Sequence, residues 1–252
     1  MKTSQGIRIK NANEVDILRK AGKILSSIVV QLQGSLTSGM STKDIDLRAE
    51  ELVRKNKVIA AFKGYRGFPG VACISVNEAV VHGIPDKRII KEGDIVSLDM
   101  GIIYEGYYSD TAVTVPIGNI SPENRRLLDV TQDSLSRGIE QARVGNRLSD
   151  ISFAVQSFVE MHGFSVVRDF VGHGIGQKLH EEPEIPNYGR PGQGPVLQEG
   201  MVFAIEPMVN VGTHRTKTLS DGWTVVTEDG KPSAHFEHTI VITSKGPEIL
   251  TQ

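Results

Sequence analysis

The chain repeats part of its own sequence. The segment EGDIVSLDMG at 92–101 resembles EGMVFAIEPM at 199–208, at an offset of 107 residues. Further upstream, GMSTKDIDL at 39–47 aligns with GNRLSDISF at 145–153, at an offset of 106 residues. One such match would be unremarkable by chance, but two nearly equal offsets in the same order indicate a duplicated unit. Corresponding strands of the two copies should then meet about a pseudo-twofold axis.

Each half has the same predicted order of elements, two helices followed by strands. Apolar residues recur at helical spacing in both halves, a capping signal precedes the second helix, and Gly163 ends the last one. The predicted helices lie around 18–32, after the capping signal at 41–44, and at 122–142 and 148–161. The halves extend roughly over 13–118 and 119–245. Together they predict an α+β fold in which each half packs two helices on an antiparallel sheet.

Composition limits the class of protein. With 252 residues the chain can bury a large core, and its formal net charge of -2 gives no electrostatic reason to bind nucleic acid or an anionic membrane. A single cysteine, Cys73, excludes an internal disulfide. We find neither a signal peptide nor the run of ~20 apolar residues that crosses a bilayer. We therefore expect a cytoplasmic monomer with no nucleic-acid or membrane partner.

Asp99 stands in a strand that is otherwise apolar. Ile95, Val96 and Leu98 precede it in a short run bounded by glycines, which is typical of a buried strand. An ionised carboxylate in such a place is costly unless a cation lies beside it. The repeat aligns Asp99 with Glu206, so both halves place a carboxylate at the corresponding position.

A hairpin is predicted directly after Asp99, with a turn signal at Glu105-Gly106. If these two residues form the loop, Asp99 faces Ala112 and Asp110 lies two residues along on the same face. If the register is centred one residue earlier, Asp99 and Asp110 are direct partners. In both registers the two carboxylates lie within ~5–8 Å, where like charges destabilise a sheet. An exposed face would tolerate them, whereas a shared cation would explain them on a buried face.

Two further residues complete an oxygen-rich set. His173 lies among glycines in GHGIG, where a ligand can approach closely, although alone it would be read as an ordinary loop histidine. Glu237 precedes TIVIT much as Asp110 precedes TAVTV. Four carboxylates and one imidazole suit divalent Mn, Fe, Co or Zn, and two bridged metal ions balance four negative charges better than one. The candidate ligands are Asp99, Asp110, His173, Glu206 and Glu237.

Six motifs surround these residues: NEAVVHGIP, SLDMG, YSDTA, GHGIGQKLHEEP, FAIEPM and HFEHT. In type and order they resemble the type I methionine aminopeptidase family of bacteria, over nearly the whole chain from the helix after Asn13 to TIVIT at 239–243. The resemblance implies a pita-bread fold with a curved sheet and a single catalytic peptidase domain over 1–252. The chain lacks the cysteine-rich N-terminal extension and the long insertion of other branches, which favours the short bacterial form.

The resemblance also implies an activity. Such an enzyme removes the initiator methionine from nascent proteins when the second residue is small, and its partners are N-terminal Met peptides and nascent chains at the ribosome. Asp99, Asp110 and Glu237 would hold one of two divalent metal ions. Asp110 and Glu237 would bridge to the second ion, which His173 and Glu206 would complete.

The implied chemistry is attack on the peptide carbonyl by a water or hydroxide that bridges the two metals. Glu206 would accept the proton of that water. His180 would donate a hydrogen bond to the carbonyl or developing oxyanion, and His82 would contact the backbone nitrogen of the second substrate residue. Without the family, both histidines would be read as ordinary loop residues.

The resemblance also implies a pocket for the methionine side chain. Soft and aromatic walls suit its thioether sulfur. Its walls would be Tyr65, Phe68, Cys73, Leu179 and Trp223. Simple packing would also explain Cys73 and Trp223. The chain departs from the family at three positions: many relatives have an aromatic residue in place of Leu179, a cysteine in place of Phe62 and a small hydroxyl residue in place of Gly101.

Two other functions remain open from the sequence alone. A proline-directed peptidase can use the same fold, but such relatives carry an additional N-terminal domain, whereas this chain starts almost at its first helix. A non-catalytic binding module usually loses metal ligands, and all five are present here.

Overall fold

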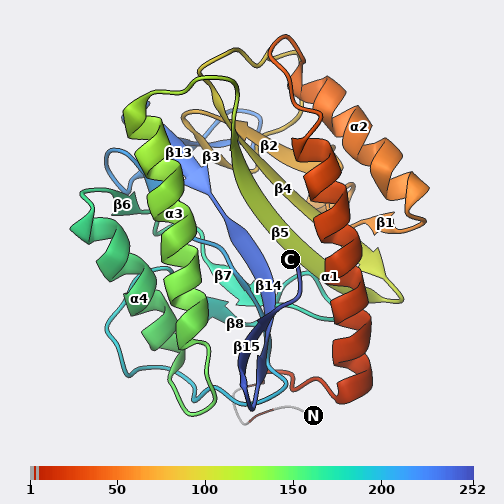
Figure 1. Ribbon diagram of the computed structural model, residues 1–252, viewed down its shortest axis with the longest axis vertical. Coiled ribbons are helices and arrows are strands. Elements are labelled where there is room, and N and C mark those ends of the chain that lie inside the picture. The colour runs from red at the N-terminus through yellow and green to blue at the C-terminus, as the bar shows by residue number, and fades with distance from the viewer. Residues whose placement is uncertain (1–2, 4–5) are drawn as a thin grey trace.

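Four α-helices cover one face of a curved antiparallel sheet in a computed structural model that describes residues 3 and 6–252 (Figure 1). The helices are α1 (Ala12–Gln33), α2 (Thr42–Lys55), α3 (Pro122–Gln141) and α4 (Leu148–Met161). They lie in two pairs on this face, with α1 beside α2 over one half of the sheet and α3 beside α4 over the other half (Figure 1). A 3-10 helix, η1 (Tyr65–Gly67), lies in the segment between Ala60 and Ala72.

Side chains at the helix starts determine where the helices begin. The side chain of Asn11 accepts a hydrogen bond from the backbone N–H of Glu14, and the Glu14 carboxylate accepts one from the N–H of Asn11. Ser41 and Asp44 form the same reciprocal capping box at the start of α2. Each box satisfies two N–H groups that a helix start leaves unpaired. The capping signal predicted at 41–44 is thus confirmed.

One sheet of nine strands runs through both halves in the order β1-β4-β5-β14-β9-β7-β8, with β2 beside β4 and β15 beside β14. Its strands are β1 (Ile59–Ala60), β2 (Ala72–Val76), β4 (Ile95–Tyr104), β5 (Tyr107–Pro116), β7 (Gly172–Gly174), β8 (Glu181–Ile185), β9 (Val202–Ile205), β14 (Glu237–Thr243) and β15 (Gly246–Ile249). Two smaller sheets have three strands each. The first contains β13 (Ser233–His235), β10 (Met208–Asn210) and β6 (Ser165–Val166), in that order. The second contains β11 (Thr216–Thr218), β12 (Val225–Thr227) and β3 (Ala79–Val81).

The two copies of the repeat fold alike. Strands β4 and β9 begin at Ile95 and Val202, which are 107 residues apart, the offset seen in the sequence. Helices α2 and α4 begin at Thr42 and Leu148, which are 106 residues apart. Strand β5 of the first half pairs with β14 of the second, so the sheet is continuous between them. The predicted α+β class, with two helices on antiparallel strands in each half, is confirmed.

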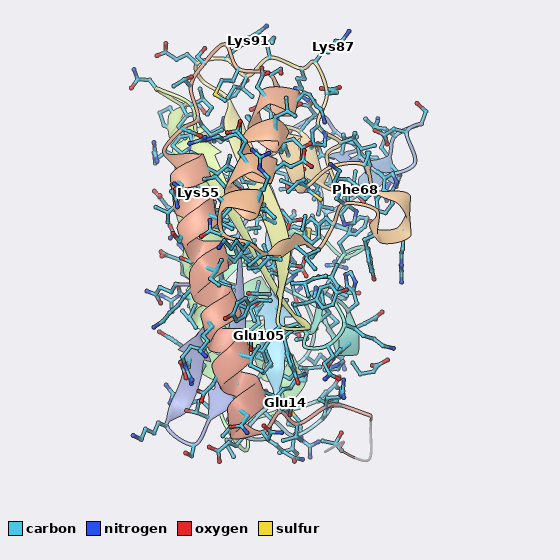
Figure 2. All side chains as sticks on the ribbon, turned by 90° about the vertical axis from the view of Figure 1, so that its right-hand side faces the viewer. Glu14, Lys55, Phe68, Lys87, Lys91 and Glu105 are labelled. Atoms are coloured by element: carbon cyan, nitrogen blue, oxygen red, sulfur yellow. The ribbon has the colours of Figure 1, made fainter. Side chains whose placement is uncertain are left out.

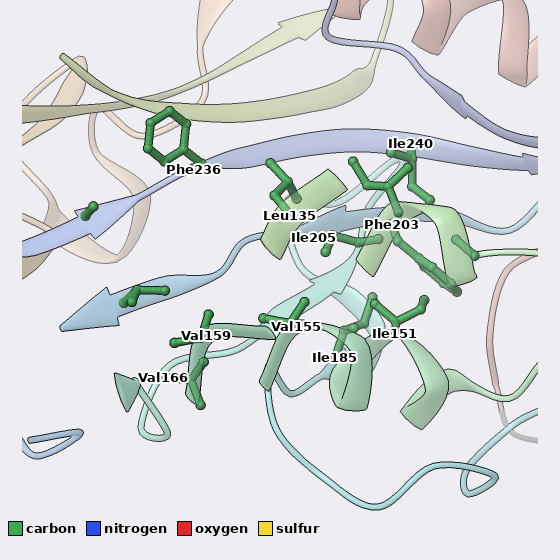
Figure 3. Packing of buried hydrophobic residues seen from close by; sticks show 14 of the residues in the cluster. Leu135, Ile151, Val155, Val159, Val166, Ile185, Phe203, Ile205, Phe236 and Ile240 are labelled. Carbon is green, nitrogen blue, oxygen red and sulfur yellow. The ribbon is translucent and has the colours of Figure 1, made fainter. Parts of the chain in front are cut away.

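An apolar core lies between the helices and the sheet in each half. In the first half, Leu25 of α1 packs in one buried cluster with Leu98 of β4. In the second half, Leu135 of α3 lies in a cluster with Phe203 of β9 and Ile240 of β14 (Figure 3). Burying each of these large side chains stabilises the fold by about 1.5–3 kcal/mol. Across the described residues, no helix has both the length and the apolar character needed to cross a membrane.

The hairpin of β4 and β5 has the first of the two predicted registers. Glu105 and Gly106 form its loop with φ of 48° and 80°, as a two-residue turn with positive φ at both positions requires. Asp99 therefore pairs with Ala112, and the register in which Asp99 and Asp110 pair directly is wrong. That register would move the loop one residue back and place a tyrosine where φ must be positive, which bulky residues avoid.

Candidate active site

The acidic residues lie on the face of the sheet opposite the helices. Leu98 belongs to the helical core, so Asp99, the next residue of β4, points to the other side. Asp99 pairs with Ala112 of β5, and Ala112 pairs with Glu237 of β14. Because directly paired residues project to the same face, Asp99 and Glu237 flank Ala112 in one row across three strands.

Asp110 lies in the neighbouring row, two residues before Ala112 on β5. Its partner on β4 is Gly101, which has no side chain to compete for the space above the sheet. Its backbone is fixed by Thr239 of β14, whose hydroxyl accepts a hydrogen bond from the Asp110 N–H at 3.1 Å and donates one to the Asp110 carbonyl at 2.7 Å. Asp110 is thus held between the other two carboxylates.

The second half contributes an imidazole and a fourth carboxylate. His173 of β7 pairs with Ala204 of β9, which also pairs with Thr239 of β14. Glu206 follows Ala204 by two residues, directly after the end of β9 at Ile205, so its side chain projects to the same face. The continuous sheet therefore brings together five residues that are spread over more than half of the sequence.

Gly101 has a second structural role beside this cluster. A Cβ atom at this position would lie 2.9 Å from Cε1 of Phe62 and 3.0 Å from the Cβ of Ala61. Contacts of that length require a shift of the neighbouring side chains. The glycine at which the chain departs from the family therefore makes room for Phe62, the second departure.

A cavity opens over the acidic face and gathers the predicted site residues. Its lining residues are Phe62, Tyr65, Arg66, Phe68, Cys73, Val81, His82, Asp99, Asp110, His173, Leu179, His180, Glu206, Trp223 and Glu237. All five candidate metal ligands, both candidate histidines and all five predicted wall residues are among them. Phe68 lies on the side of the sheet opposite α1 (Figure 2). Phe62, Arg66 and Val81 also line the cavity and were not predicted as site residues.

The arrangement of donor atoms fits a divalent metal. One ligand atom from each of Asp110, His173 and Glu237 lies within 4.8 Å of the others, and all three residues are buried. Oδ1 of Asp110 and Oε1 of Glu237 are buried with no hydrogen-bond partner among the described residues. Buried carboxylate oxygens normally have a partner, so these two atoms fit the residues of a site for a divalent cation.

The raised pKa values of the clustered carboxyl groups also favour a cation site. Burial raises the pKa of Asp99 to about 7, against a hydrogen bond from Cys73 that lowers it. Burial, followed by the negative charges of the neighbouring carboxylates, raises the pKa of Asp110, Glu206 and Glu237 well above the ordinary range. Four carboxylic groups in one buried site repel one another unless protons or cations neutralise them. Divalent cations bound among them would neutralise these charges.

His173 is held as a neutral imidazole. Its Nδ1 lies 2.9 Å from the carbonyl oxygen of Gly174, an interaction in which the ring N–H donates. The other nitrogen, Nε2, is then free of its proton and lies 3.6 Å from Oε1 of Glu206. Burial lowers the pKa of His173 to about 3, which favours the neutral ring. A metal-binding histidine commonly has this arrangement.

His180 and His82 lie at the edge of the cluster. Nδ1 of His180 is 2.8 Å from the hydroxyl of Tyr65, and its ring centre is 4.3 Å from that of His173. His82 has a positive φ of 58° and stands edge-on to the rings of Phe170 and Trp223. A non-glycine residue in this conformation is strained, and such strain is concentrated at functional sites.

The expected wall residues form an apolar end of the cavity. Phe68, Cys73 and Leu179 are buried, and the ring of Phe68 meets that of Trp223 edge-on at 5.2 Å. Cys73 also pairs with Asp99 across β2 and β4, so one residue contacts both the apolar wall and the acidic cluster.

His235 is a buried histidine that sequence reasoning missed. It is 1% exposed, neither ring nitrogen has a hydrogen-bond partner within the described chain, and Nε2 lies 3.7 Å from Oε2 of Glu206. HFEHT contained a signal for it, because a residue two positions before Glu237 on a continuous strand would share its face. The structure places His235 in β13 and Glu237 in β14.

Comparison with known proteins defines the class to which this fold and site belong. Residues 16–244 match Metallopeptidase family M24, and the chain belongs to that family. Within it the chain is a relative of the methionine aminopeptidases. It is 56% identical over 245 residues to a methionine aminopeptidase from Clostridium perfringens, covering 97% of this chain and 98% of that protein.

Two further comparisons agree. The chain is 53% identical over 243 residues to methionine aminopeptidase 1 from Bacillus subtilis, covering 96% of this chain and 98% of that protein. A crystal structure of methionine aminopeptidase from Thermotoga maritima has a TM-score of 0.96 and 47% identity, covering 98% of this chain and 99% of that one. The predicted family and its pita-bread fold are confirmed.

Proposed function

We propose that the chain hydrolyses the first peptide bond of proteins that begin with methionine. The observation that carries this proposal is the meeting, in one cavity, of an unneutralised carboxylate cluster, two histidines and an apolar pocket. The membership of family M24 and the identity to methionine aminopeptidases over nearly the whole chain support it.

In this proposal two divalent ions would be held on the acidic face. The residues that would hold them are Asp99, Asp110, His173, Glu206 and Glu237. When bound, such ions lower the pKa of water and polarise the scissile carbonyl. Mn, Fe, Co and Zn all suit the oxygen and nitrogen donors.

The protein's own side chains perform the remaining steps. The carboxylate of Glu206 takes the proton of the attacking water. Nδ1 of His180 lies 2.8 Å from the Tyr65 hydroxyl. With that hydroxyl as the donor, the ring proton stays on Nε2, and the Nε2–H donates a hydrogen bond to the carbonyl oxygen as negative charge develops. His82 contacts the nitrogen of the second substrate residue and supports departure of the amine.

The apolar end of the cavity receives the methionine side chain. Aromatic and thiol walls suit its polarizable sulfur. Leu179 and Phe62, both buried here, together shape the pocket at positions where relatives have other residues. We expect a tight site for the second substrate residue, so that glycine and alanine are accepted and larger residues are not.

The proposed substrates are N-terminal Met peptides and nascent chains, met at the ribosome in the cytoplasm. We propose that the protein acts as a monomer, since one chain contributes all five candidate metal ligands and both candidate histidines to the cavity.

A peptide panel tests the proposal. Purified protein is stripped with a chelator, reloaded with Mn, Co, Fe or Zn one at a time, and assayed on Met-Gly-X, Met-Ala-X, Met-Leu-X and X-Pro-X peptides. Metal-dependent cleavage of the first two is expected. Preferential cleavage of X-Pro-X would instead indicate a proline-directed peptidase, and no cleavage of any peptide would indicate a binding module.

A further inference from the structure

A buried ion pair lies outside the machinery described so far. Nζ of Lys10 is 2.9 Å from Oε2 of Glu181, and the two side chains are only 4% and 5% exposed. The residues are 171 positions apart in the sequence. A lysine is rarely buried, and here burial lowers its pKa while Glu181 opposes that shift. Such a pair is costly to bury, so its presence at one particular turn calls for an explanation.

Glu181 directly follows His180 and begins β8. While Oε2 of Glu181 receives Lys10, Oε1 accepts a hydrogen bond from the N–H of Lys178 at 3.3 Å. The carboxylate therefore closes the turn at 178–181, whose tip carries His180. The N–H of Gly176 donates to the carbonyl of Lys178 at 3.1 Å and continues the same turn.

Lys10 is itself fixed to the turn that precedes β9. Its backbone N–H donates to the carbonyl oxygen of Gly200 at 2.8 Å. A Cβ at Gly176 would lie 2.7 Å from Cε of Lys10 and 2.8 Å from Oε1 of Glu181, so the ion pair packs directly against the backbone of the turn. The segment before α1 thus holds the turn that carries His180 from outside the cavity, since Lys10 is not among the cavity-lining residues.

We propose that Lys10 is a positioning residue, which through its ion pair with Glu181 holds His180 in register with the substrate carbonyl. The inference rests on the proposed function, because it assigns Lys10 to the oxyanion contact of that reaction. Small displacements of a catalytic group are costly: a misplacement of about 1 Å can lower a rate by about 100-fold. Removing Lys10 leaves Oε2 of the buried Glu181 carboxylate without its hydrogen-bonded cation, while Arg8 stays 3.6 Å from Oε1, so we expect the turn to open and hydrate Oε2.

Arg8 offers a matched control. Its Nη1 lies 3.6 Å from Oε1 of the same Glu181, but its side chain is 38% exposed and it also donates to Gln177 at 2.8 Å. An exposed pair of this length contributes little, so Arg8→Met should lower kcat by less than about 3-fold.

The test is a double-mutant cycle on Met-Ala-X cleavage by the metal-loaded full chain. Lys10→Met should lower kcat by about 10- to 100-fold with KM nearly unchanged, because the transition-state contact is lost. In a His180→Ala background the same substitution should lower kcat by less than about 2-fold, because the contact it positions is already absent. The melting temperature should fall equally in both backgrounds.

Each outcome decides between the alternatives. An equal loss of kcat in both backgrounds would show that the ion pair only stabilises the fold, and would overturn the inference. If Lys10→Met does not fold, Glu181→Gln replaces it in the same double-mutant cycle. This substitution keeps the side-chain volume and one acceptor oxygen, and the losses of kcat in the two backgrounds are compared in the same way. Wild type that cleaves no Met peptide would overturn the proposed function itself, whatever the variants do.

Discussion

Replacing Asp110 by asparagine should raise the stability of the metal-free protein while abolishing activity. Asp110 lies between the other carboxylates, and its ligand oxygen is within 4.8 Å of that of Glu237. At this distance and an effective dielectric of about 20, two unit charges repel by about 3 kcal/mol, an upper limit. Protons bound at the raised pKa values relieve part of this repulsion, which leaves about 1–2 kcal/mol per removed charge as the expected gain.

Thermal melting measures this gain. For a chain of this size, about 1 kcal/mol corresponds to about 2–4 °C, so metal-free Asp110→Asn should melt about 2–8 °C above metal-free wild type. Metal at about 100 times its dissociation constant stabilises the folded state by about 2.7 kcal/mol, so wild type should gain about 5–11 °C with excess Mn or Co. The variant should gain little, because it lacks a bridging ligand.

The same four melting curves can refute the reasoning. A metal-free variant that melts below metal-free wild type, together with equal shifts on adding metal, would mean that Asp110 is not a ligand. The unpaired oxygens of Asp110 and Glu237 would then need another explanation.

Three other substitutions test separate parts of the account. His180→Ala should lower kcat by ~10²–10³-fold, the scale for removing one donor to an oxyanion, and a loss under ~5-fold in steady-state assays would exclude His180 from the transition state. Trp223→Ala opens the apolar end of the cavity, so KM for Met-Ala-X should rise at least about 10-fold in the same assay, and an unchanged KM would remove Trp223 from the methionine pocket. Gly22→Ala places a Cβ 2.1 Å from the carbonyl oxygen of Leu250, so the melting temperature should drop by several degrees with the metal-bound kcat retained, and wild-type melting would show that this contact relaxes freely.

Much of the fold could be read from the sequence because local signals and the repeat agree. The capping pattern at Ser41 fixes the start of α2, and the offset of 107 residues relates β4 to β9. The position of Gly106 decides the register of the hairpin, since glycine tolerates the positive φ that its loop requires. That register then places Asp99 and Asp110 on one face.

Contacts between distant segments could not be read in this way. Phe62 lines the cavity because Gly101 of β4, 39 residues later in the chain, leaves space for it, and no local pattern predicts such a contact. The burial of Lys10 against Glu181 depends on two segments that meet only in the folded chain, and lysine alone predicts an exposed position. The sequence places His235 two residues before Glu237, but its burial next to Glu206 depends on β13 and β9, which meet only in the folded chain.

The central claim is that the acidic face binds a pair of metal ions, and anomalous X-ray diffraction from crystals grown with Mn or Co tests it directly. The account predicts two anomalous peaks in the cavity, one in contact with Asp99 and the other with His173 and Glu206, with carboxylates of Asp110 and Glu237 reaching both. Peaks located elsewhere, or a cavity without any peak at saturating metal, would contradict it.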